Sequence, residues 1–87
     1  MNNTQEDVFQ TISKIIIEQI DEEVTLTPET NIYDDLAVDS IELVEISVKL
    51  EKIFAVSLPF SELRNCITLL DLVNAITRAK QENKIDA

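Results

Sequence analysis

Apolar residues recur at helical spacing along most of this chain, and no other feature restricts its fold so strongly. Near the start they fall at positions i, i+4, i+7, i+8 and i+12, one stripe of an α-helix: Val8, Ile12, Ile15, Ile16 and Ile20. Such a stripe has to be buried against other elements of the fold. We therefore expect a helix over residues 4–19, and Thr4 with Asp7 resembles a capping box at its start.

Two later segments show the same period. A second helix is predicted over residues 40–54. Thr68 and Asp71 form another candidate capping box, which opens a last helix that ends near Lys80. The apolar stripe of this last helix consists of Leu69, Leu72, Val73, Ile76 and Ala79.

The connections between these helices differ in length. Residues 21–38 hold few periodic apolar residues and predict a long loop, in which Thr27-Pro28-Glu29 is expected to form one helical turn with Thr27 as its cap. Long connections are often functional. Pro59 leads into a short helical turn near residues 61–65.

Together these elements predict an all-α fold. We expect one domain over residues 1–87, a small four-helix bundle with three main helices, one short helix and a long loop after the first helix. The polar residues 81–87 are expected to fray as a tail.

Composition excludes several classes of function. Seven basic against seventeen acidic residues give a net charge of −10, which argues against nucleic acid and favours partners with basic docking patches. The chain has no His, the commonest general base and metal ligand, so we predict neither catalysis nor a metal site. The lone Cys66 cannot form an intramolecular disulfide and is expected to be a small buried hydrophobe.

No apolar run is long enough for a membrane span, and the first residues, MNNTQED, lack the basic region of a signal peptide. We expect a cytoplasmic protein.

The second helix carries two apolar faces. Its core stripe is predicted to comprise Leu43, Ile46, Leu50, Ile53 and Phe54. The second face, about 160° away on a helical wheel, comprises Ile41, Val44 and Val48, and Glu45, Glu51 and Lys52 lie along its borders. An apolar strip framed by charges is typical of a docking surface. The alternatives are that the long loop covers the strip, or that three apolar residues are simply exposed.

The start of this helix has two interpretations. Asp39 at the N-cap and Glu42 three residues later form an acidic capping box, a purely structural role. Ser40 would then lie in the first turn with its hydroxyl exposed, where it is either a structural residue or an attachment point for chemistry.

The stretch "DDLAVDSIELVE", followed by "IFAVSLP", resembles the acyl carrier protein family, and the order of elements along most of the chain is similar too. The resemblance implies that Ser40 carries a 4'-phosphopantetheine arm, attached by a phosphopantetheinyl transferase that uses coenzyme A, and that acyl groups are held on it as thioesters. Asp39 matches the acid beside the modified serine. The partner-binding positions implied by the resemblance are Ile41, Glu42, Val44, Glu45, Val48 and Glu51.

The resemblance further implies a monomeric, non-catalytic carrier that serves as substrate of acyl-loading, acyl-transferring and condensing enzymes. The acyl chain can enter the core of related proteins, which is lined here by Leu43, Ile46 and Leu50.

Some positions depart from the family pattern. Ala37 stands where a Gly is usual, which argues against a positive φ there. Lys52 stands where an acid is usual, Lys49 adds a second base to the same helix, and Phe60 replaces a typically acidic residue after Pro59. These changes favour a specialised fatty-acid, polyketide or secondary-metabolite pathway over housekeeping fatty-acid synthesis.

Two other classes compete with the carrier. One is a helical interaction module without a prosthetic group, dimerised through Ile41, Val44 and Val48. The other is a calcium-binding loop built from Asp34, Asp35, Asp39 and Glu42, which is disfavoured because the loop lacks the Gly and the spaced ligands of an EF-hand. The Gly-Gly-His-Ser-like motif of peptidyl carriers is absent, so acyl cargo is favoured over an amino acid.

Overall fold

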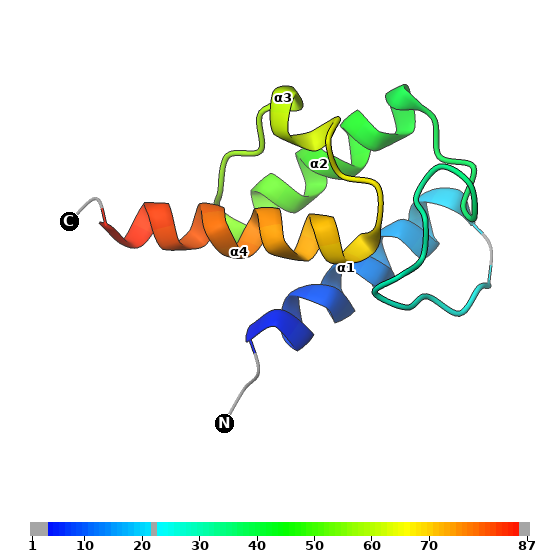
Figure 1. Ribbon diagram of the computed structural model, residues 1–87, viewed down its shortest axis with the longest axis horizontal. Helices are drawn as coiled ribbons and strands as arrows, with labels where there is room; N and C mark the ends of the chain where they lie inside the picture. Colours follow the sequence, from blue (N-terminus) through cyan, green and yellow to red (C-terminus); the bar gives the residue numbers. More distant parts are fainter. Residues whose placement is uncertain (1–3, 22, 86–87) are drawn as a thin grey trace.

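The computed structural model describes residues 4–21 and 23–85, and within these residues the regular elements are all helical. The helices are α1 (Thr4–Ile20), α2 (Ser40–Phe54), α3 (Phe60–Leu63) and α4 (Leu69–Ile85). α1 packs against both α2 and α4, and the short α3 packs against α4 (Figure 1). The predicted all-α, four-helix architecture is confirmed.

A single core joins the four helices: α1, α2 and α4 each contribute an apolar stripe, and the short α3 contributes Leu63. The loops add four residues to this core, Ile32 and Val38 before α2 and Leu58 and Cys66 on either side of α3. Cys66 is only 4% exposed, which confirms its expected place as a small buried hydrophobe.

Two predicted helix ends need correction. α4 continues to Ile85, so residues 81–85 of the expected tail are helical. Gln, Glu and Lys are good helix formers and no Gly or Pro interrupts this segment, so nothing stops the helix at Lys80. α3 begins at Phe60 rather than at residue 61, with Pro59 as its N-cap and the following residues in a turn.

One predicted core residue is on the surface. Ile53 is 56% exposed, while Leu43, Ile46 and Leu50 are at most 2% exposed and Phe54 is half-buried. Ile53 lies about 60° from Leu50 on the helical wheel and in the last turn of α2, so it falls at the edge of the buried stripe. Periodicity alone does not locate that edge.

The long loop after α1 is fastened to the segment that enters α4. The backbone N–H of Ile32 donates to the Ile67 carbonyl at 2.8 Å, and the N–H of Leu69 donates to the Thr30 carbonyl at 3.1 Å. Near Pro28 the chain forms a turn closed by Thr30 N–H on the Thr27 carbonyl at 3.0 Å. It is not a turn of helix, and Thr27 is not a side-chain cap, because the Thr30 hydroxyl accepts from Thr27 N–H instead.

The chain contains no Gly, yet it places three residues in the left-handed region: Asp21, Ala37 and Ala55, with φ of 57°, 55° and 56°. Asp21 and Ala55 follow the last residues of α1 and α2, where this conformation commonly ends a helix. Ala37 contradicts the expectation that an Ala at this position avoids a positive φ. The constraint comes from its neighbours, because Val38 is buried and its N–H donates to the Ile32 carbonyl at 3.3 Å.

None of the described helices is both long enough and apolar enough to cross a membrane.

Candidate functional site

The candidate site begins at the N-terminus of α2, where the predicted capping box is present. Asp39 is extended, its Oδ1 accepts a hydrogen bond from Glu42 N–H at 2.8 Å, and Glu42 Oε1 accepts one from Asp39 N–H at 3.4 Å. Both acids are therefore engaged with the backbone at the helix start, which holds the first turn in place.

Ser40 is the first residue of α2, and it is exposed. Its hydroxyl makes no hydrogen bond with any part of the chain that the structure describes. Val38, two residues earlier, is 3% exposed and anchors the chain in the core directly before the site. The serine is thus held by its backbone while its side chain stays available to a reagent from solvent.

This position suits a phosphopantetheine group. The group joins a serine through a phosphate, and the positive end of a helix dipole with its orphan N–H groups favours an anion. The exposed side chain leaves room for the arm outside the protein. The residues present therefore fit the group, with Ser40 as the only hydroxyl in the first turn of α2.

An apolar strip starts beside Ser40 and runs along α2. We call Ile41, Val44 and Val48 the docking strip; they are 71%, 42% and 43% exposed. The hypothesis that the long loop covers them is wrong, because that loop is fastened to the start of α4 instead. The structure thus brings the proposed attachment serine and the strip together on one helix.

Two acids near the strip accept hydrogen bonds that the sequence did not predict. Glu51 is half-buried, and its Oε2 accepts a hydrogen bond from Leu58 N–H at 2.6 Å, so its carboxylate faces the loop after α2. Glu45 is exposed and its Oε1 accepts from Gln19 Nε2 at 2.8 Å. Lys49 Nζ donates to Oε1 of the same Gln19 at 2.8 Å.

Sequence reasoning missed Gln19, which joins α1 to the charged side of α2. A polar residue in the last turn of a helix is usually solvated, and no local pattern shows that it reaches two charges on another helix. Its partners are 26 and 30 residues away in sequence, so only the tertiary packing brings them together.

Asn31 and Asp35 of the long loop hold it in local turns. Asn31 Oδ1 accepts from the N–H groups of Tyr33 and Asp34, and Asp35 Oδ2 accepts from Asn31 N–H. In the described residues no group of three His, Cys, Asp or Glu side chains comes together to hold a metal ion. The calcium interpretation of this loop therefore has no geometric support.

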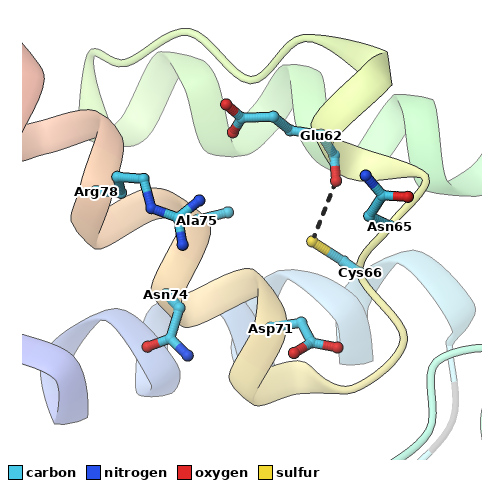
Figure 2. Close-up of a pocket in the computed structure, with 7 residues that line it drawn as sticks. All are labelled: Glu62, Asn65, Cys66, Asp71, Asn74, Ala75 and Arg78. Atoms are coloured by element: carbon cyan, nitrogen blue, oxygen red, sulfur yellow. Dashed lines mark hydrogen bonds between the residues drawn. The ribbon is translucent and has the colours of Figure 1, made fainter.

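A polar hollow of about 220 Å³ lies between α3 and α4. Figure 2 shows Arg78 and Asn74 of α4 on one side of it and Glu62 and Cys66 on the other, with the thiol of Cys66 donating to the Glu62 carbonyl at 3.6 Å. Burial, reinforced by the nearby carboxylates of Asp71 and Glu62, raises the pKa of the Cys66 thiol to about 11. The thiol is therefore protonated at neutral pH and is a weak nucleophile.

The residues expected to line an acyl chamber, Leu43, Ile46 and Leu50, are packed in the core. They line neither this hollow nor two further surface hollows, one beside Phe9 and one beside Ser57. Entry of a chain between them would require the helices to separate.

Comparison with known proteins places these observations in a family. Residues 10–76 match the family described as "Phosphopantetheine attachment site". The chain is 37% identical to the meromycolate extension acyl carrier protein of Mycobacterium leprae over 92% of this chain and 70% of that protein. It is 35% identical to the acyl carrier protein of Campylobacter lari, over 79% of this chain and 91% of the relative.

A solved structure has the same fold. It is that of a Mycobacterium tuberculosis protein assigned as an acyl carrier protein, with a TM-score of 0.77, 22% identity, and coverage of 82% of this chain and 96% of that one. The family match covers most of the chain, and the exposed serine lies at the start of a capped helix. This chain therefore belongs to the acyl carrier protein family.

Proposed function

We propose that Ser40 is the residue that carries the phosphopantetheine arm and that the docking strip beside it is the surface read by partner enzymes. The observation that carries this proposal is the exposed Ser40 at the N-terminus of α2, directly followed by Ile41, the most exposed large apolar residue of the described chain. When bound, the arm supplies a terminal thiol that holds acyl groups as thioesters, so the protein itself needs no nucleophile.

The neighbouring residues have distinct roles in this proposal. Asp39 fixes the helix start through its bond to Glu42 N–H, and its outer oxygen faces the metal and basic groups of the transferase. Ile41, Val44 and Val48 supply apolar contact to each partner.

The acids supply steering and register. Glu42 and Glu45 lie on the half of α2 nearest Ser40. Each uses its Oε1 in a hydrogen bond within the protein, and its Oε2 is the oxygen that faces a partner. Glu51 contributes charge to the same field, while its Oε2 holds Leu58 N–H and so fixes the loop at the far end of the strip.

The cargo in this proposal is an acyl group of a specialised lipid pathway. The mycobacterial relatives are named for meromycolate extension, which supports a role in building long acyl chains in preference to polyketides or other secondary metabolites. The partners are the phosphopantetheinyl transferase and the loading, transferring and condensing enzymes, with basic docking patches that match a net charge of −10. The carrier acts in the cytoplasm as a monomer and is their substrate, not a catalyst.

Intact-protein mass spectrometry tests the attachment site. The parent chain is incubated with coenzyme A and a promiscuous phosphopantetheinyl transferase, beside Ser40→Ala and, as a matched control, Ser57→Ala, which removes another exposed hydroxyl. We expect one phosphopantetheine on the parent and on Ser57→Ala and none on Ser40→Ala.

A gain of phosphopantetheine on Ser40→Ala would show that another residue is the attachment site. A folded parent that gains no mass would contradict the attachment role of Ser40 and favour a docking module dimerised through the strip, which sedimentation of Ile41→Asp would then test.

A further inference from the structure

The exposed side of α2 changes its charge along the helix. The half next to Ser40 holds acids and no base, whereas the far half holds two bases and one acid. In order along the chain these residues are Asp39, Glu42 and Glu45, then Lys49, Glu51 and Lys52. The docking strip runs past both halves, so a partner seated on it meets both charges.

The single acid of the far half does not cancel Lys52, the base that borders the strip. Glu51 is half-buried with its carboxylate bound to Leu58 N–H, whereas Lys52 is exposed. Lys52 makes no ion pair or hydrogen bond with any residue that the structure describes. It lies one turn beyond Val48 and about 40° from it on the helical wheel, so a free ammonium group marks the end of the strip.

Gln19 of α1 contacts the last acid of the near half and the first base of the far half. The Gln19 side chain donates to Glu45 and accepts from Lys49, each at 2.8 Å. Because one amide orients both groups, the acid and the base keep fixed positions one turn apart. The charge pattern is therefore ordered before a partner arrives, which lowers the entropy lost on docking.

We propose that α2 is a bipolar docking surface, fitted to enzymes whose docking patch is basic opposite residues 39–45 and acidic opposite Lys49 and Lys52. The inference rests on the proposed function of the strip and names the chemistry of its partners. The net charge of −10 attracts basic surfaces of any kind, so attraction alone does not discriminate among them. The far lysines discriminate after encounter, because a patch that is basic along its whole length meets like charge at Lys52.

The test uses a phosphopantetheinyl transferase with a uniformly basic docking groove as the probe, and follows kcat/KM on the full chain by intact mass. Lys52→Glu is expected to raise kcat/KM by roughly twofold to fivefold, the range of one exposed charge contact. Lys14→Glu, on the exposed side of α1, changes the net charge equally and serves as the matched control. It should stay near the parent rate.

A second arm reverses the charge on the enzyme. Each base of the transferase groove is replaced by Glu in turn, and the rates with the parent and with Lys52→Glu form a double-mutant cycle. At one groove position the acid should speed the parent and slow Lys52→Glu, which identifies the site that faces Lys52.

The outcomes separate a failure of the bipolar surface from a failure of the proposed function. If Lys52→Glu is no faster than Lys14→Glu, or if no groove acid reverses the order of rates, the bipolar surface is overturned while modification at Ser40 stands. If the parent is never modified, the proposed function fails first, and this inference falls with it.

Discussion

α2 and α4 begin with the same local device and end up with opposite roles. At each start an oxygen-bearing side chain accepts from the N–H three residues on, and the carboxylate of that later residue accepts from the cap. The pairs are Asp39 with Glu42 and Thr68 with Asp71, so the capping boxes predicted at these two helix starts are present. The third predicted box, Thr4 with Asp7, depends on the Thr4 side chain, which lies outside the described part of the chain.

The residues that follow each cap differ in their surroundings. After Thr68 comes Leu69, which is fully buried, with its N–H on the Thr30 carbonyl. After Asp39 come Ser40 and Ile41, which face solvent. The long loop is fastened to one helix start and leaves the other open, so the capping motif makes a helix start and the tertiary contacts decide whether it is scaffold or site.

The comparison is tested most strongly by truncating the first apolar residue of each helix. Leu69→Ala should lower the free energy of unfolding by about 2–5 kcal/mol, because it leaves a cavity in the core. Ile41→Ala should change it by less than about 0.5 kcal/mol, because that side chain is 71% exposed. Urea titration followed by circular dichroism measures both. Similar losses for the two variants would show that the strip is structural.

A thiol at the start of α4 should react much more slowly than a thiol at the start of α2. Cys66 lies just before α4, and its pKa of about 11 against an ordinary 9.0 leaves about a hundredfold less thiolate at pH 8. We expect iodoacetamide to label Cys66 about a hundredfold more slowly than an exposed thiol. The reference is Ser40→Cys combined with Cys66→Ser, which places the only thiol at the start of α2. Equal labelling rates, followed by intact mass, would contradict the burial of Cys66.

The same pKa shift sets a limit on stability in alkali. The folded state holds the Cys66 proton more tightly than the unfolded state, so this contribution is present below pH 9.0 and is lost as the pH rises towards about 11. In Cys66→Ala this loss should be missing from the pH dependence of unfolding.

The sequence predicted what is local in this fold. The apolar periods gave α1, α2 and α4, and the caps of α2 and α4 follow from residues three apart. Contacts that reach beyond a single helix were not predicted: Gln19 between Glu45 and Lys49, and the N–H of Leu58 on Glu51. These contacts depend on how α1 and the loop after α2 are placed, which no single helix period specifies.

A smaller effect separates the capping acids themselves. The N–H groups of Thr68 and Ile67 lower the pKa of Asp71 below its usual 3.8. Its charge therefore stabilises the fold fully above pH 3.8, and the contribution is lost as the pH falls through the lower, folded pKa. Asp71→Asn should lose about 0.5–1.5 kcal/mol at pH 7, and the difference from the parent should shrink in acid. Asp39→Asn should lose little, because Asn caps as well as Asp. A loss for Asp71→Asn that does not vary with pH would exclude the charge as its cause.

The smallest change concerns the loop that presents α2. Ala37 has a φ of 55°, where a Cβ is unfavourable by about 1 kcal/mol, and Gly removes this strain. Gly also makes the unfolded chain more flexible, which offsets about 0.4–1 kcal/mol of the gain. We expect Ala37→Gly to raise Tm by no more than about 4 °C. Ala79→Gly, in the middle of α4, should lower the stability by about 1 kcal/mol, because Gly is unfavourable in a helix. If Ala37→Gly lowers Tm as Ala79→Gly does, the left-handed geometry before Asp39 is wrong. The capping box alone would then have to hold Ser40 in position.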